Sequence, residues 1–202
     1  SKNKKFKNLN QKYTWLKKQN NKLKGRAYDI SRFHPSLFKL IFCKKLKIVL
    51  KNYFGKEPLI DYPEIKIQDC SNKRLLPFHQ DVYGSLSSKS LVLWLALTDV
   101  SKINGTISVI KGSHKMGKLK HKYYKKNSFK AHGVLKELYK NMKNTYINIK
   151  PGDAILFHPL LIHGSSKNKS NKIRLNCILR FADISGINYM NNLKSNSLRN
   201  PQ

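Results

Sequence analysis

The feature that most constrains the fold is a change in hydrophobic period near Leu59. Before this point apolar residues recur at helical spacing, whereas after it Ile65 and Ile67 alternate with polar side chains, as in a strand. A strongly apolar run at 91–98 follows, with polar turn clusters on both sides. Further strands are predicted at 106–110, 146–149, 154–157 and 173–181. Short strands separated by turn clusters predict an all-β core built as a sandwich or barrel.

Helices are predicted to flank this core. An apolar stripe with lysines between its members predicts one amphipathic helix over 36–54, which suits packing on one face of a sheet. Ser36 is its candidate N-cap, and Gly55 is the candidate residue for its C-terminal cap.

The chain is long enough for one domain with a sizeable core. The predicted parts are a basic arm at 1–28, a single domain at 29–187 with an insertion at 118–144, and a polar tail at 188–202. Within the arm, 13–23 predicts a short helix docked through Trp15 and Leu16. The insertion is basic and rich in tyrosine, with a short helical pattern at 134–142. It is either a functional lid or a lysine-rich surface loop.

Three features of the sequence bear on where the protein is located in the cell. No run of 18 apolar residues is present, so no membrane span is expected, and no signal peptide is visible at the N-terminus. The sequence starts with Ser1, from which we expect a truncated N-terminus. Three cysteines, Cys43, Cys70 and Cys177, show no pairing pattern, which favours a reducing compartment and a cytoplasmic location.

The formal net charge of +31 has two interpretations. It indicates either a nucleic-acid or anionic-surface partner or the codon usage of an AT-rich genome. The second is favoured because the basic residues are mostly lysines, occur together with many asparagines and isoleucines, and are spread along the chain. A preference for anionic substrates is compatible with both.

A metal-binding motif stands in the segment 77–82, which is predicted to be extended. Side chains at positions i and i+2 of a strand point to the same face, so His79 and Asp81 offer a nitrogen and an oxygen to one point. Two such ligands are part of the 2-His-1-carboxylate triad of non-haem Fe(II) oxygenases.

Two histidines compete for the third ligand position, His158 and His163. His163 is followed by Gly164, which allows a close turn, and by Arg174 eleven residues later. The polar turn between them suits a hairpin that returns Arg174 to the metal site, where a guanidinium can bind a carboxylate through two parallel hydrogen bonds. His163 is therefore favoured.

At this point the residues resemble a known family. Over about residues 60–182 the chain is similar to the phytanoyl-CoA dioxygenase family of Fe(II)- and 2-oxoglutarate-dependent oxygenases. The resemblance rests on the order of His79-Gln80-Asp81, the run 93–97, the segment 104–115 with Gly112-Ser113-His114-Lys115, Pro151-Gly152-Asp153, His163-Gly164-Ser165 and Arg174.

The resemblance implies a fold and a set of roles. The fold is a double-stranded β-helix, a cupin-like jelly roll. The implied reaction hydroxylates a small organic substrate with O2 and releases succinate and CO2 from 2-oxoglutarate, with ascorbate as a candidate additional cofactor. His79, Asp81 and His163 match the iron ligands, and Arg174 matches the residue that binds the distal carboxylate of 2-oxoglutarate. The other residues assigned to the co-substrate pocket are Gln68, Gln80, Trp94 and Ser165 or Ser166.

Several alternatives remain open from the sequence. Trp94 is equally explained as core filling, because an indole in an apolar strand packs well. The +31 charge motivates a non-catalytic nucleic-acid-binding protein, although no known nucleic-acid-binding motif is visible. A third possibility is a metal-binding jelly roll without redox activity. The lysines and tyrosines of 118–144 favour a small anionic substrate, while substrate identity and oligomeric state are not determined by the sequence.

Overall fold

The structure is a computed structural model that describes residues 5–19, 34–41, 43–61, 63–71, 75–81, 87, 89–126 and 129–183. The predicted tail at 188–202 and part of the basic arm lie outside these residues. The described helices are α1 (Leu9–Gln19), α3 (Pro35–Ile41) and α4 (Lys44–Phe54), with the 3-10 turns η1 (Ser113–Met116) and η2 (Lys136–Leu138). The strands are β1 (Leu59–Ile60), β2 (Glu64–Gln68), β3 (Ser90–Ala96), β4 (Ile107–Ile110), β5 (His121–Lys126), β6 (Phe129–Val134), β7 (Asn144–Tyr146), β8 (Ala154–Phe157), β9 (His163–Ser165) and β10 (Arg174–Ala182).

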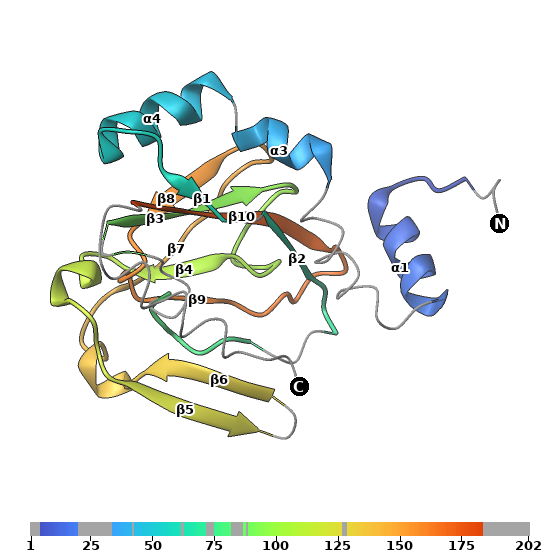
Figure 1. Ribbon diagram of the computed structural model, residues 1–202. Helices are drawn as coiled ribbons and strands as arrows, with labels where there is room; N and C mark the ends of the chain where they lie inside the picture. Colours follow the sequence, from blue (N-terminus) through green and yellow to red (C-terminus); the bar gives the residue numbers. More distant parts are fainter. Residues whose placement is uncertain are drawn as a thin grey trace.

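Two antiparallel sheets form the core (Figure 1). The larger sheet has the order β1-β10-β3-β8, with β2 also paired to β10, and the smaller one has the order β7-β4-β9. Strands distant in sequence are therefore neighbours in space, as in a jelly roll. The predicted all-β core with flanking helices is confirmed.

Strand β3 separates two layers of the core. All seven of its residues are buried, which explains its continuous apolar run. Leu91, Leu93 and Leu95 pack toward the helices, together with Leu179 of β10 and Leu50 of α4. The alternate residues of β3 pack toward the smaller sheet: these are Val92, Trp94 and Ala96.

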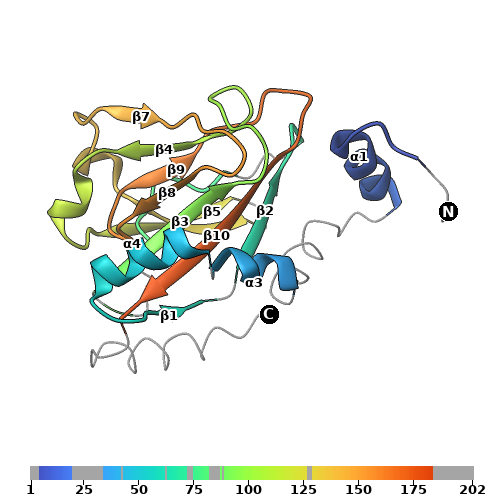
Figure 2. The same cartoon turned by 90° about the horizontal axis from the view of Figure 1, so that it is seen from above.

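The predicted helix over 36–54 is wrong in its continuity. Two helices, α3 and α4, occupy this stretch and lie over the outer face of the larger sheet (Figure 2). Cys43, with ψ 134°, has an extended backbone and ends the helical course between them. The predicted N-cap is also wrong, because helix α3 begins at Pro35 and the Ser36 amide donates to His34 Nδ1. The predicted cap at Gly55 is confirmed, with φ 76° in the left-handed region and its amide bonded to Lys51.

Helix α1 docks on the sheets through residues other than those predicted. Tyr13, not Trp15, is its buried residue, and the Tyr13 hydroxyl donates to Asp69 Oδ2 at 2.8 Å. Lys17 reaches the same oxygen at 2.9 Å. These polar contacts were not visible in the hydrophobic pattern of the arm.

The insertion at 118–144 is mostly extended rather than helical. Strands β5 and β6 pair as a hairpin, and only the short 3-10 turn η2 falls within the predicted helical stretch. The backbone amide of Val134 donates to the carbonyl of Phe78, which ties the hairpin to the segment that carries His79. The strand predicted at 146–149 is displaced, because β7 ends at Tyr146.

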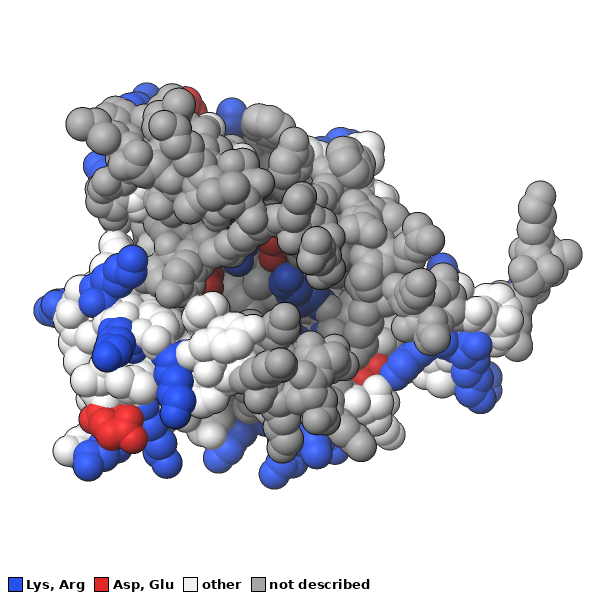
Figure 3. Space-filling model, turned by 60° about the horizontal axis from the view of Figure 1, so that its bottom comes forward, with Lys and Arg blue, Asp and Glu red and all other residues white. Residues whose placement is uncertain are grey.

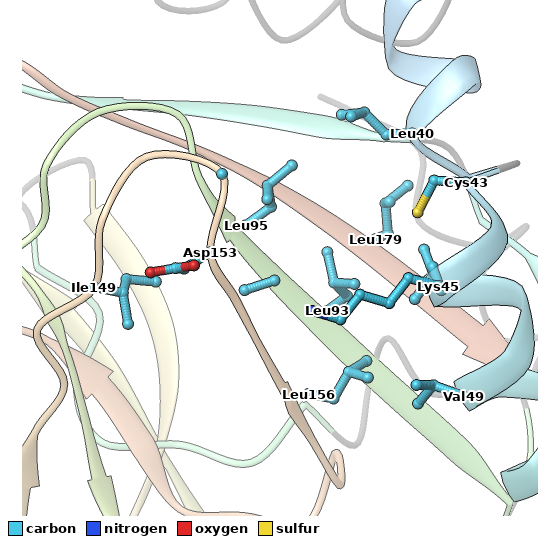
Figure 4. Close-up of a pocket in the computed structure, with 13 residues that line it drawn as sticks. Leu40, Cys43, Lys45, Val49, Leu93, Leu95, Ile149, Asp153, Leu156 and Leu179 are labelled. Carbon is cyan, nitrogen blue, oxygen red and sulfur yellow. The ribbon is translucent and has the colours of Figure 1, made fainter.

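A cavity of about 500 Å³ lies between the helices and the outer face of the larger sheet. Figure 4 shows Leu93, Leu95, Leu179 and Val49 around it, with Lys45 also in its lining. It lies on the side of the sheet opposite to Trp94, and it is therefore separate from the space between the two sheets. In the described part of the chain, no helix has the length and apolarity needed to cross a membrane.

We expect Leu179→Ala to lower the free energy of unfolding by about 2–5 kcal/mol, because the Leu179 side chain is 0% exposed and truncation leaves a cavity. The same substitution at Leu138, which is 39% exposed, should change it by less than about 1 kcal/mol. Urea unfolding of both variants measures the difference. Equal destabilisation would contradict the packing described for the outer layer.

Candidate metal centre

His79 and His163 are brought together by backbone pairing. The two residues form an isolated antiparallel bridge, in which His79 N donates to His163 O at 2.9 Å and His163 N donates to His79 O at 3.0 Å. Their ring centroids lie 4.3 Å apart. The amide of Asp81 donates to the carbonyl of Pro159 at 2.8 Å, which holds the third residue beside the same segment.

The three side chains converge on one point. One candidate ligand atom from each of His79, Asp81 and His163 lies within 4.8 Å of the other two. Asp81 Oδ1 is 3.4 Å from His79 Nε2 and 3.8 Å from His163 Nε2. His163 is buried, and the other two residues are half-buried. The structure thus brings together the three residues predicted as metal ligands.

The hydrogen bonds of the two imidazole rings use Nδ1 of each and leave Nε2 of each available to a metal. His79 Nδ1 lies 2.8 Å from the carbonyl of Pro77, and His163 Nδ1 lies 2.9 Å from the carbonyl of Leu161. A carbonyl only accepts, so each Nδ1 carries the proton and each Nε2 presents a lone pair. Carbonyl partners of this kind are the usual support of metal-binding histidines.

Charge around Asp81 favours the ionised carboxylate. Burial raises the pKa of Asp81, but its contact with His79 and the positive charge of Arg180 outweigh burial, so the pKa falls below its ordinary value. Burial, followed by the proximity of His79, lowers the pKa of His163 to about 4. A neutral His163 imidazole and an ionised Asp81 carboxylate therefore face each other at neutral pH.

This set of donors fits a divalent transition metal. Three lone-pair-bearing atoms that point at each other repel unless a cation lies between them, and two nitrogens with one oxygen form the 2-His-1-carboxylate set. His158 is not part of the cluster: its Nδ1 accepts from the Leu160 amide, and its ring lies 6.0 Å from that of His114.

Arg174 lies buried on the inner face of β10. Its guanidinium donates to Gln68 Oε1 and to Asn176 Oδ1, and its Cζ lies 5.2 Å from the centre of the Trp94 ring. Burial lowers the pKa of Arg174 to about 10, which still leaves it charged at neutral pH. Gln68 also donates to the carbonyl of Ser166 at 2.8 Å, so it holds the arginine in a fixed orientation.

Glycine is required beside this arginine. Gly105 has φ +95°, and a Cβ at this position would lie 2.6 Å from Gln68 Oε1. A side chain here would displace the amide that orients Arg174.

Trp94 fills the core between the sheets, and its role in lining a co-substrate pocket stays a prediction. It is a buried member of the core between the sheets, and its ring also packs against Arg174. Ser165 lies on β9 two residues after His163, and Ser166 Oγ donates to the carbonyl of Thr106 at 3.1 Å. Their assignment to the co-substrate stays a prediction.

The buried side chain of Gln80 bonds to backbone groups near the metal cluster. Its Nε2 donates to the carbonyls of Gly117 and Leu160 at 2.8 and 2.7 Å, and its Oε1 accepts from the Leu119 amide at 2.9 Å. Gln80 therefore joins its own segment to two loops, one at 117–119 and one at Leu160. Its predicted role at the co-substrate stays a prediction.

Sequence reasoning missed three polar residues at the site. Arg180 contacts Asp81 Oδ2 at 3.7 Å and Glu64 Oε1 at 3.4 Å, and Asn176 contacts Arg174. The available signal was the period of two along β10, which places positions 176 and 180 on the same face as Arg174.

Residues 5–176 match the family described as phytanoyl-CoA dioxygenase (PhyH). "Phytanoyl-CoA dioxygenase, peroxisomal" of Bos taurus is 34% identical over 113 residues, which cover 53% of this chain and 33% of the bovine protein. "Phytanoyl-CoA dioxygenase 1" of Oryza sativa subsp. japonica is 30% identical over 151 residues, which cover 75% of this chain and 50% of the rice protein. The chain thus spans a third to a half of the length of these two relatives.

Solved structures agree in fold. The non-heme monooxygenase ThoJ superposes with a TM-score of 0.64 at 20% identity, covering 86% of this chain and 66% of ThoJ. EctD from S. alaskensis, solved with 2-oxoglutarate and 5-hydroxyectoine, gives a TM-score of 0.62 at 24% identity, covering 78% of this chain and 56% of EctD. The family match extends over most of the chain, and the protein therefore belongs to the phytanoyl-CoA dioxygenase family.

Proposed function

We propose that the chain is an Fe(II)- and 2-oxoglutarate-dependent dioxygenase that hydroxylates a small organic substrate and releases succinate and CO2. The observation that carries this proposal is the convergence of His79, Asp81 and His163 on one point. A buried arginine, Arg174, stands on β10, the strand whose Arg180 contacts Asp81. Relatives named as dioxygenases and the 2-oxoglutarate in the EctD structure support it.

Each residue then has a defined task. His79 Nε2, His163 Nε2 and Asp81 Oδ1 would hold the metal from one side and leave its other side open. Bound Fe(II) supplies the redox chemistry that couples decarboxylation of 2-oxoglutarate to oxidation of the substrate by O2. Arg174 binds and orients the distal carboxylate of 2-oxoglutarate, and Trp94 keeps water away from the guanidinium. Ascorbate is proposed as an additional reductant.

The substrate that we propose is anionic, because the β5–β6 hairpin is basic and adjoins the metal cluster. His121 Nε2 of this hairpin accepts from the backbone amide of Gln80, between the two ligands of the motif. Lys122, Tyr123 and Tyr124 are exposed on it. We propose that the insertion at 118–144 acts as a lid within a single domain at 29–187.

Basic residues are not confined to the hairpin. Figure 3 shows lysine and arginine side chains spread over the described part of one face, around a hollow that contains both acidic and basic groups. The nucleic-acid hypothesis rests on the same net charge and stays a prediction.

The cysteines Cys43, Cys70 and Cys177 are all unpaired, which supports a proposed cytoplasmic location.

We expect His163→Ala to lower Fe(II)-dependent succinate release more than about 100-fold, because removing a ligand costs more than the 10–100-fold typical of an outer partner. Its affinity for iron should fall as well. His158→Ala is the matched control and should keep both within about twofold. The proposal is wrong if wild type and His163→Ala bind iron equally and neither consumes 2-oxoglutarate.

Arg174→Lys should raise the KM for 2-oxoglutarate by about 10- to 100-fold, because an ammonium cannot reproduce the paired hydrogen bonds of a guanidinium. Iron affinity should stay unchanged, since Arg174 is not one of the converging ligands. Steady-state kinetics and metal titration measure the two effects. An unchanged KM would remove Arg174 from the co-substrate site.

Anionic compounds in a panel of candidate substrates should stimulate 2-oxoglutarate decarboxylation more than neutral ones of similar size. Lys122→Glu should reduce this stimulation several-fold and make it less sensitive to salt. Lys51→Glu, an equal charge reversal on the exposed face of α4, is the control and should leave it unchanged. Equal effects of the two variants would indicate a role of net charge alone.

A further inference from the structure

The inner face of β10 carries a buried amide whose donor has no acceptor. Asn176 is 0% exposed, and its Oδ1 accepts a hydrogen bond from the Arg174 guanidinium. A guanidinium has only donors, so this contact uses Oδ1 of the amide and leaves Nδ2 free to donate elsewhere. Within the described residues, Asn176 Nδ2 has no hydrogen-bond partner.

Arg174, beside Asn176, also has a buried donor for which the described residues offer no acceptor. Its Nε is buried and has no partner among the described residues. Its two terminal nitrogens contact the neutral amides Gln68 and Asn176, and no described carboxylate forms an ion pair with it. Buried charges are normally paired and buried donors are normally bonded, because leaving either unsatisfied costs free energy.

The surroundings of Asn176 place its amide between the two sheets. Ala96 lies directly opposite it on β3, so no large side chain faces it from that position. Arg174 precedes Asn176 on the same face, and Ile178 follows it and packs against the core between the sheets. The donors of Asn176 and Arg174 therefore belong to the same inner surface as Trp94.

We propose that Asn176 is a second co-substrate-binding residue, whose Nδ2 donates a hydrogen bond to the distal carboxylate of 2-oxoglutarate beside Arg174. The proposal rests on the function proposed above. A carboxylate would satisfy both groups, because it supplies a negative charge for the Arg174 guanidinium and an acceptor oxygen for Asn176 Nδ2. Asn176 then selects for 2-oxo acids that carry a second carboxylate.

The test compares two 2-oxo acids on the Ni(II)-loaded protein, in which binding is measured without turnover. 2-Oxoglutarate carries the distal carboxylate, whereas 2-oxobutyrate lacks it. Calorimetric titration of Asn176→Ala should show 2-oxoglutarate binding weakened by roughly 10-fold or more, as expected for a hydrogen bond to a charged group. Binding of 2-oxobutyrate should stay within about twofold of wild type.

Asn176→Asp keeps the shape of the side chain and separates this role from packing. It replaces the donor with a carboxylate that pairs with Arg174 and repels the co-substrate, so it should weaken 2-oxoglutarate binding more than Asn176→Ala does. Asn168→Ala is the matched control. Asn168 is also buried, but its amide is fully used by the carbonyls of Gln68 and Lys172 and by Ser170, so the ratio of the two affinities should stay unchanged.

The outcomes are distinguishable. Equal weakening of both 2-oxo acids by the Asn176 variants would give Asn176 a structural role and overturn the inference alone. An unchanged ratio of affinities in these variants would do the same. Failure of the wild-type Ni(II) protein to bind 2-oxoglutarate would overturn the proposed function and this inference together.

Discussion

The antiparallel bridge between His79 and His163 is the contact on which the rest of the site depends. Neither residue lies in a long strand, since β9 has only three residues and His79 pairs as an isolated bridge. Two backbone hydrogen bonds nevertheless fix the two imidazoles side by side. The side chain of Gln80 joins the same segment to the carbonyls of Leu160 and Gly117, so the ligand positions depend on satisfied backbone groups rather than on side-chain packing.

Strand β10 connects this site to the stability of the domain. Its outward residues Cys177, Leu179 and Phe181 are buried against the helical layer, and the strand pairs with three others. Apolar burial on that face offsets the cost of placing arginines on the other. The alternation along β10 reflects these two faces: Arg174, Asn176 and Arg180 point inward, and Cys177, Leu179 and Phe181 point to the helical layer.

Much of the fold was predictable, because alternation and turn clusters are local signals. The positions of β3, β8 and β10 and the cap at Gly55 follow from them. The break between α3 and α4 was not predictable, since the apolar stripe continues across Cys43 and only the packing of two separate helices ends the first one. At the site, the ligand set follows from spacing and resemblance. The hydrogen bonds of Gln80 do not, because its partners are backbone groups of loops distant in the sequence.

The two arginines of β10 differ in what neutralises them. Arg180 contacts Asp81 and Glu64, and although burial lowers its pKa, these charges outweigh burial and raise it. Its contact with Asp81 Oδ2 leaves Oδ1, the oxygen nearest both imidazoles, to face a metal. Arg174 has only amide acceptors among its described hydrogen-bond partners, which suits the anionic co-substrate proposed for it. One strand thus serves both the proposed cation site and the proposed anion site. The difference between its two arginines is that carboxylates of the chain pair with Arg180, whereas amides contact Arg174.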